Sequence, residues 1–152
     1  ILNQKKLFRK IMQFVSRLKI APEHIVDSVL ASMNKSTKKV FLEFLDEFDK
    51  VNSEQGTKKR LVPYFIAGHP GSTITDMEIL RKFCDEKKIY VNLTQVFTPT
   101  PGTASTAAYF TGKDTFTKEE VHVARNFREK KDQKNVLVLR DANDLGEEDN
   151  LG

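Results

Sequence analysis

The chain has 152 residues, of which 39% are hydrophobic and 30% are charged, and its formal net charge is +4. This composition is typical of one soluble domain of ordinary size. It excludes a helical membrane protein, because no apolar run approaches the roughly 20 residues that span a bilayer. The single cysteine, Cys84, excludes an internal disulfide and suits a reducing cytoplasm. We therefore expect a cytoplasmic protein with no membrane partner.

The first residues differ from a secretory signal. Residues 1–18 carry scattered charges, whereas a signal has a continuous apolar stretch and a small-residue cleavage site. The first residue is Ile1 rather than Met. We interpret the chain as a segment cut from a longer protein.

Apolar strand-like runs alternate with amphipathic helical stretches along the chain. The pattern predicts, in chain order, a helix at 4–15, a strand at 17–21, a helix at 25–33, a helix from about 37 that stops near Gly56, a strand at 61–67, a helix from 73 to 84, a strand at 91–97, a short helix at 104–110, an edge strand at 121–123 and a basic helix at 125–139. We expect one domain over 1–140 and a polar, frayed tail over 141–152.

Two prolines qualify the predicted strands. Pro22 is expected to end the first strand. Pro63 is awkward within a central strand, because proline cannot donate the ladder hydrogen bond.

The alternation of strands and helices predicts an α/β fold with a parallel sheet, which is either open or part of a barrel. Ligands bind beyond the carboxyl ends of such strands. Three segments of unusual composition follow the predicted strands, namely 22–24, 68–73 and 98–103. We expect all three to lie on the same rim of the sheet.

Each of these loops has a functional and a structural interpretation. Glu23 can accept hydrogen bonds from a ribose or an ammonium group, or it can begin a helix, where acidic side chains are favoured. In 68–73, the glycines and a helix N-terminus let a ligand approach the backbone, or the loop is an ordinary turn. His69 is a general base, a metal ligand or neither. The prolines in 98–103 stiffen a ligand loop or a rigid connection of no chemical consequence.

Other motifs are absent or ambiguous. Three His and one Cys are too dispersed for a zinc site, so no metal ligands are predicted. Cys84 stands between apolar residues at helical spacing, which indicates a buried and inert thiol. The sequence contains no P-loop, dinucleotide fingerprint or Ser-His-Asp arrangement. Basic runs such as 58–60 indicate either solvated surfaces or contact with a phosphate backbone.

Three segments resemble the YgiQ-type radical S-adenosylmethionine (SAM) family. They are LKIAPEH at 18–24, LVPYFIAGHPGST at 61–73 and QVFTPTPGT at 95–103, and they occur in the order and spacing of that family. YFTG at 109–112 and REK at 128–130 also resemble its pattern. There is a more distant likeness to tRNA methylthiotransferases, in which GHPGST resembles their GFPGET and TPTPGT resembles their SPRPGT.

The resemblance implies the carboxyl-terminal half of a partial (β/α)6 TIM-like barrel, with the three predicted strands as the fourth, fifth and sixth. In that family a CxxxCxxC motif holds a [4Fe–4S] cluster that binds and cleaves SAM. This motif is absent here. We therefore expect the parent protein to use SAM and the cluster, and we expect this segment to bind neither and to be inactive alone.

By resemblance, the cofactor-binding residues lie after the first two predicted strands. Glu23 would contact SAM, Ile66, Ala67 and Gly68 would pack against its adenine, and His69, Pro70, Gly71 and Ser72 would border the same pocket. Ser72 replaces the acidic residue of GFPGET, which removes a charged contact there. No catalytic residue is assigned.

Two classes of partner follow. A radical SAM segment would have the amino-terminal remainder of its parent as partner, with RNA as a candidate substrate. The alternative is a non-catalytic α/β binding module that contacts nucleic acid or protein through its basic helices.

Overall fold

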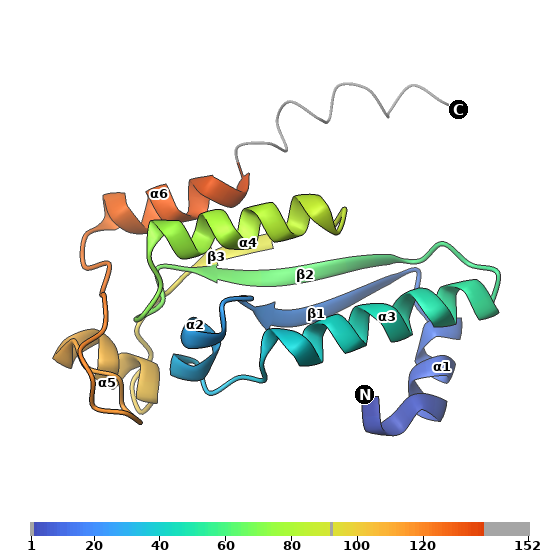
Figure 1. Cartoon of the computed structure of the whole chain (residues 1–152), viewed down its shortest axis with the longest axis horizontal. Helices are drawn as coiled ribbons and strands as arrows, with labels where there is room; N and C mark the ends of the chain where they lie inside the picture. The colour runs from blue at the N-terminus through green and yellow to red at the C-terminus, as the bar shows by residue number, and fades with distance from the viewer. Residues whose placement is uncertain (1, 92, 139–152) are drawn as a thin grey trace.

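The computed structural model describes residues 2–91 and 93–138. The strands are β1 (Arg17–Glu23), β2 (Arg60–Ala67) and β3 (Leu93–Val96), which form a parallel sheet in the order β1-β2-β3. After a short 3-10 turn (Leu2–Gln4), the helices are α1 (Lys5–Phe14), α2 (Asp27–Ser32), α3 (Lys38–Glu54), α4 (Ile74–Glu86), α5 (Ala104–Thr111) and α6 (Phe127–Val138) (Figure 1). The prediction of an α/β fold with three parallel strands, each followed by a helix, is confirmed.

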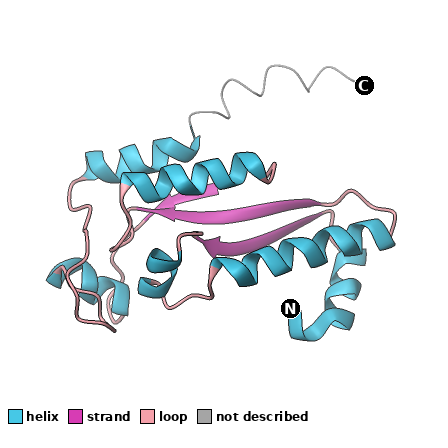
Figure 2. Cartoon of the chain, viewed as in Figure 1, coloured by secondary structure: helices cyan, strands magenta, loops and turns pink. Residues whose placement is uncertain are grey.

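One face of the sheet carries the apolar core. Phe65 and Ala67 of β2 pack with residues of α4 and with Leu137 of α6, while Leu18 of β1 packs with α1 and α3. Phe41 of α3 contacts both clusters, so the core is continuous. Accordingly, α2 and α3 run beside β1, whereas α4 and α6 run beside β2 and β3 (Figures 1 and 2).

The opposite face of the sheet is covered far less. Side chains alternate between the two faces of a strand, and partners in register share a face. The pairs on this face are Lys19 with Val62, Tyr64 with Leu93 and Ile66 with Gln95. Lys19 and Gln95 are exposed, Tyr64, Ile66 and Leu93 are half-buried, and Val62 is buried. The described helices therefore pack mainly on one side of the sheet.

Both prolines lie inside strands, contrary to the expected stop at Pro22. The strand β1 continues through Pro22 to Glu23, with a break in register after Ile20. Proline is tolerated there because β1 is an edge strand of the described sheet and the register break interrupts its ladder. Pro63 is tolerated because β3 pairs with β2 only from Tyr64 onward, so at Pro63 the strand has β1 as its one described neighbour.

The predicted edge strand at 121–123 is wrong. The backbone groups there bond to loops instead of a strand: the Val121 N–H donates to the Gly112 carbonyl, and the His122 carbonyl accepts from the Gly71 N–H. Only an isolated antiparallel bridge, between Lys113 and Glu120, forms nearby. The predicted tail at 141–152 lies outside the described residues. No helix in the described chain is both long and apolar enough to cross a membrane.

Candidate functional site

The loops after β2 and β3 meet at the carboxyl end of the sheet. Phe97, the first residue after β3, donates its N–H to the Ala67 carbonyl at the end of β2. The ring of Phe97 also meets the ring of His69 edge to face, with centroids 5.1 Å apart. The loops after β2 and β3 are therefore in direct contact, as the parallel topology predicts.

Glu23 and His24 end β1 in opposite environments. Glu23 has a left-handed φ of 66°, is partly exposed, and pairs with the Lys35 ammonium at 3.0 Å. His24 is only 1% exposed, and its Nδ1 accepts the Val26 N–H at 3.1 Å. The register of β1 breaks between Ile20 and Glu23, and His24 then packs against the segment that leads into α2.

The imidazole of His24 has one unpaired nitrogen. Because Nδ1 accepts a hydrogen bond, Nε2 carries the proton of the neutral ring, and within the described chain Nε2 has no hydrogen-bond partner. Burial lowers the pKa of His24 to about 4, and the charge of Asp76 only partly opposes this. At neutral pH the ring is therefore uncharged.

His69 joins the loop after β2 to α5. Its Nδ1 lies 2.7 Å from the Pro70 carbonyl, which can only accept, so Nδ1 is the donor. Its Nε2 must then accept, and the Ser105 hydroxyl lies 2.8 Å away as the donor. Burial is the main cause that lowers the pKa of His69. Both ring nitrogens are used by the protein itself, which leaves neither free to ligate a metal.

Gln133 of α6 fixes the backbone of the same loop. Its Oε1 accepts the Gly68 N–H at 2.8 Å and the Ser72 hydroxyl at 3.2 Å. Its Nε2 donates to the Ser72 carbonyl at 3.0 Å. Gln133 and Ser72 are fully buried. We call these three hydrogen bonds the Gln133 clamp; through it, α6 holds the loop that the sequence motif marks as a ligand loop.

Gly68 has two reasons to be a glycine: the turn needs its positive φ, and α6 passes too close to leave room for a side chain. Its φ is +71°, and a Cβ at this position would lie 2.9 Å from Cγ of Lys130. The N–H groups of Gly68 and Gly71 already have protein acceptors, in Gln133 and His122. The absence of a side chain at Gly68 thus lets α6 pack closely against this loop, whether or not a ligand also binds there.

The residues predicted to bind the cofactor lie on and beside these loops. Ile66 lies on the less covered face, whereas the Ala67 side chain is buried on the helix side and its carbonyl accepts the Phe97 N–H. His69, Pro70 and Ser72 are buried, and Gly71 is half-buried. Thr103 caps α5, with its hydroxyl accepting the Thr106 N–H, and a cluster of threonine hydrogen bonds stiffens the loop after β3.

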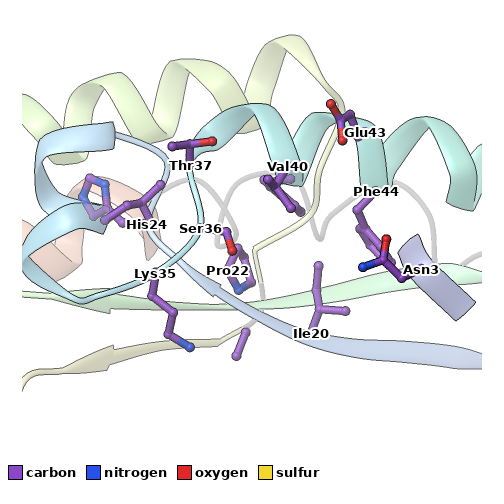
Figure 3. A pocket seen from close by; sticks show the side chains of 13 residues that line it. Asn3, Ile20, Pro22, His24, Lys35, Ser36, Thr37, Val40, Glu43 and Phe44 are labelled. Carbon is purple, nitrogen blue, oxygen red and sulfur yellow. The ribbon is translucent and has the colours of Figure 1, made fainter. Parts of the chain in front are cut away.

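A cavity of about 630 Å³ lies elsewhere, on the helix side of β1. It is lined by Ile20 and Pro22 of β1, by the segment around Lys35 and by Phe44 of α3 (Figure 3). His24 also borders it, but none of residues 66–72 does. This cavity is therefore separate from the loops that follow β2 and β3.

The described chain holds no group of three or more His, Cys, Asp or Glu side chains that could bind a metal ion. Cys84 is buried in the apolar core, and burial raises the pKa of its thiol to about 12. Such a buried thiol is typical of a structural, unreactive cysteine.

Sequence reasoning missed Ser105, Lys130 and Gln133. A signal for two of them was present, because Lys130, Gln133 and Leu137 follow helical spacing and form the buried side of α6. Two polar residues on a buried helical face indicate specific hydrogen-bond partners.

Comparison with known proteins identifies the family. A UPF0313 protein of Geobacter sulfurreducens is 45% identical over 121 residues, covering 80% of this chain and 20% of that protein. A UPF0313 protein of Methanocaldococcus jannaschii is 38% identical over 125 residues, covering 82% of this chain and 21% of its own length. The chain belongs to the UPF0313 family. This is the YgiQ family that the strand-end motifs predict.

The UPF0313 chain spans about a fifth of the length of these relatives. A UPF0313 protein of Thermotoga neapolitana has a similar match, 41% identical over 125 residues, 82% of this chain and 22% of that protein. A family model described as a domain of unknown function, DUF3362, matches residues 92–146. That match includes β3, α5 and α6, and therefore the residues of the Gln133 clamp that lie on α6.

Proposed function

We propose that this UPF0313 chain forms part of the catalytic barrel of a radical SAM protein and lines one side of its SAM-binding space. The observation that supports the proposal best is the uneven covering of the sheet. Helices pack on one face, while Lys19, Tyr64 and Gln95 stand on a face that they leave accessible. In a β/α barrel the helices lie outside and the other face of the sheet points to the interior.

The residues at the strand ends suit parts of SAM. The Glu23 carboxylate is accessible beside the sheet and can accept hydrogen bonds from an ammonium or from ribose hydroxyls. Ile66 offers apolar surface on the less covered face of the sheet, suited to an adenine ring. Reductive cleavage of bound SAM would supply the radical chemistry. This chain would bind and orient the molecule.

The described residues do not fit a [4Fe–4S] cluster. Such clusters need several thiolates, and Cys84 is single, buried and protonated at neutral pH. Within this proposal, the cluster ligands come from another part of the full-length protein, which is then the partner of this segment. RNA is a candidate substrate of the full-length protein, and no described residue makes a contact specific for RNA.

The alternative, a binding module that uses basic helices, has weaker support. Arg128 and Lys131 of α6 are exposed. Two acidic residues of the same helix, Glu129 and Asp132, lie next to them in the sequence. The side chain of Glu129 is already paired with His122. This mixture of charges does not form the continuous basic face that phosphate backbones favour.

The test is calorimetric titration of SAM into the full-length protein that contains this segment, after reconstitution. We expect Glu23→Ala to weaken SAM binding by about ten- to a hundredfold, the effect of losing a hydrogen bond to a charged group. We expect His24→Ala to have a smaller effect. The matched control is Lys35→Met, which breaks the same ion pair but keeps the carboxylate, and should leave the affinity near that of the wild type. Equal affinities for wild type and Glu23→Ala would remove Glu23 from the site.

A further inference from the structure

The side chain of Lys130 is buried, and its ammonium has no counter-ion among the described residues. Lys130 is 8% exposed, and its Nζ lies 3.3 Å from the Phe97 carbonyl and 3.4 Å from the Tyr109 hydroxyl. Both distances exceed the 2.7–3.2 Å typical of good N–H···O bonds, so the two contacts are weak. Among the described residues, no carboxylate forms an ion pair with it. Burial of an ammonium that lacks an anion is unfavourable, and this position therefore favours an incoming anion.

Aromatic rings hold the ammonium in place but do not neutralise it. Nζ lies 4.4 Å from the centroid of the Tyr109 ring and 5.8 Å from that of Phe97. Such cation–π contacts compensate part of the lost hydration. The stem of Lys130 is packed against Gly68, which fixes the direction of the side chain.

A second cation approaches the same tyrosine. The Arg125 guanidinium lies 5.9 Å from the centroid of the Tyr109 ring, and it donates to the Phe110 carbonyl at 3.4 Å. Arg125 also forms no ion pair with a carboxylate in the described part of the chain. Two cations therefore converge on one ring, and among the described residues neither forms an ion pair with a carboxylate.

The position of Lys130 in the fold is where parallel sheets bind ligands. Its Nζ reaches the carbonyl of Phe97, the first residue after β3, and its stem crosses Gly68, the first residue after β2. These are the carboxyl ends of two neighbouring strands.

We propose that Lys130, with Arg125 on the neighbouring side of Tyr109, binds a small anionic group, a carboxylate or a phosphate, of a ligand that enters at the carboxyl ends of β2 and β3. This site does not depend on radical SAM chemistry, because it needs only the two cations and the strand ends.

The test is an NMR titration of the protein with inorganic phosphate and, separately, with acetate, at constant ionic strength so that general screening does not change. The amide signals of Gly68 and Thr98 report on the site. We expect saturable shifts in wild type, and an affinity about tenfold lower or worse in Lys130→Met. The matched control is Lys131→Met, which removes the same charge from an exposed neighbour and should leave the shifts unchanged.

Further variants keep the test decisive if Lys130→Met fails to fold. Tyr109→Phe removes a neutral partner of the ammonium, and we expect it to keep or strengthen anion binding. Arg125→Met should weaken it. Saturation by acetate alone identifies a carboxylate, and saturation by phosphate alone identifies a phosphate. The proposal is overturned if neither anion gives saturable shifts, if Tyr109→Phe and Arg125→Met do not differ in affinity, or if a folded Lys130→Met binds as wild type does.

Discussion

The two ends of the sheet are held by different kinds of interaction. On the amino-terminal side, α1 packs on α3 through Phe8 and Phe44, whose rings are 5.7 Å apart, and Glu47 forms ion pairs at the margin of that contact. On the carboxyl-terminal side, α6 holds the loop after β2 through the buried hydrogen bonds of Gln133. Apolar packing tolerates small shifts, whereas hydrogen bonds fix direction and distance. The hydrogen bonds that fix the loop after β2 are fully buried, whereas those at the amino-terminal end are only partly buried.

The largest expected effect comes from breaking the Gln133 clamp. Gln133→Leu removes three hydrogen bonds and leaves the Gly68 N–H and Ser72 groups buried without partners. We expect a loss of about 2–4 kcal/mol in the free energy of unfolding, measured with urea. Gln95→Leu, the same change at an exposed position of β3, is the control and should have little effect. A small loss of unfolding free energy in Gln133→Leu would mean that water molecules satisfy the groups that Gln133 binds in wild type.

The second test uses the buried imidazole of His24. Burial lowers its pKa to about 4 in the folded protein, from about 6.5 in the unfolded chain. The unfolded state therefore binds more protons between these values, and stability is complete above pH 6.5 and falls as the pH drops towards 4, by roughly 3 kcal/mol from this group. His24→Asn should flatten this dependence. A dependence that His24→Asn leaves as steep as in wild type would show that another group titrates in this range.

Two glycines with similar backbone angles separate strain from steric contact. Gly68 and Gly56 have φ values of +71° and +61°, but a Cβ at Gly56 would meet nothing within 4 Å. Gly56→Ala should therefore cost about 1–2 kcal/mol from the left-handed conformation alone. Gly68→Ala should cost more, because the new methyl group meets Lys130 as well. Equal losses in the free energy of unfolding, measured by thermal or urea denaturation, would show that Lys130 and α6 shift to accommodate the new methyl group at little cost.

The smallest expected effect lies at the amino-terminal side. A hydrogen bond from Lys5, together with the nearby charges of Lys5 and Arg9, keeps the pKa of Glu47 below its usual value. The stability from this carboxylate is therefore present above its unfolded pKa and lost as the pH falls through the folded value. Glu47→Gln should be less stable than wild type at pH 7, and the two should converge in acid. Glu43→Gln, at an exposed position of the same helix, should match wild type throughout.

The sequence predicts the elements better than the contacts between them. The apolar stripe of α3 and the apolar run of β2 are local patterns, and both elements lie where these patterns predict. The register break that lets β1 continue past Pro22 depends on the neighbouring strand, which no local pattern reports. The strand expected at 121–123 failed for the same reason, because its backbone groups found partners in distant loops.

The candidate site divides in a similar way. Parallel topology correctly places the loops after β2 and β3 in contact, which the Phe97 bond to Ala67 confirms. The residues that hold those loops were not predicted, since Gln133 lies 65 positions from Gly68 along the chain. The contacts proposed between Glu23 or the 66–72 segment and SAM stay predictions.

The DUF3362 match starts at residue 92, immediately before β3, and therefore divides the sheet. That boundary separates β3 from β2, although the two strands are hydrogen-bonded neighbours in one sheet. It also separates Gln133 from the loop whose amide it holds. We therefore expect the matched segment not to fold by itself. Exchange of this region between UPF0313 proteins is expected to succeed only when the loop after β2 and the helix α6 are inherited from the same parent.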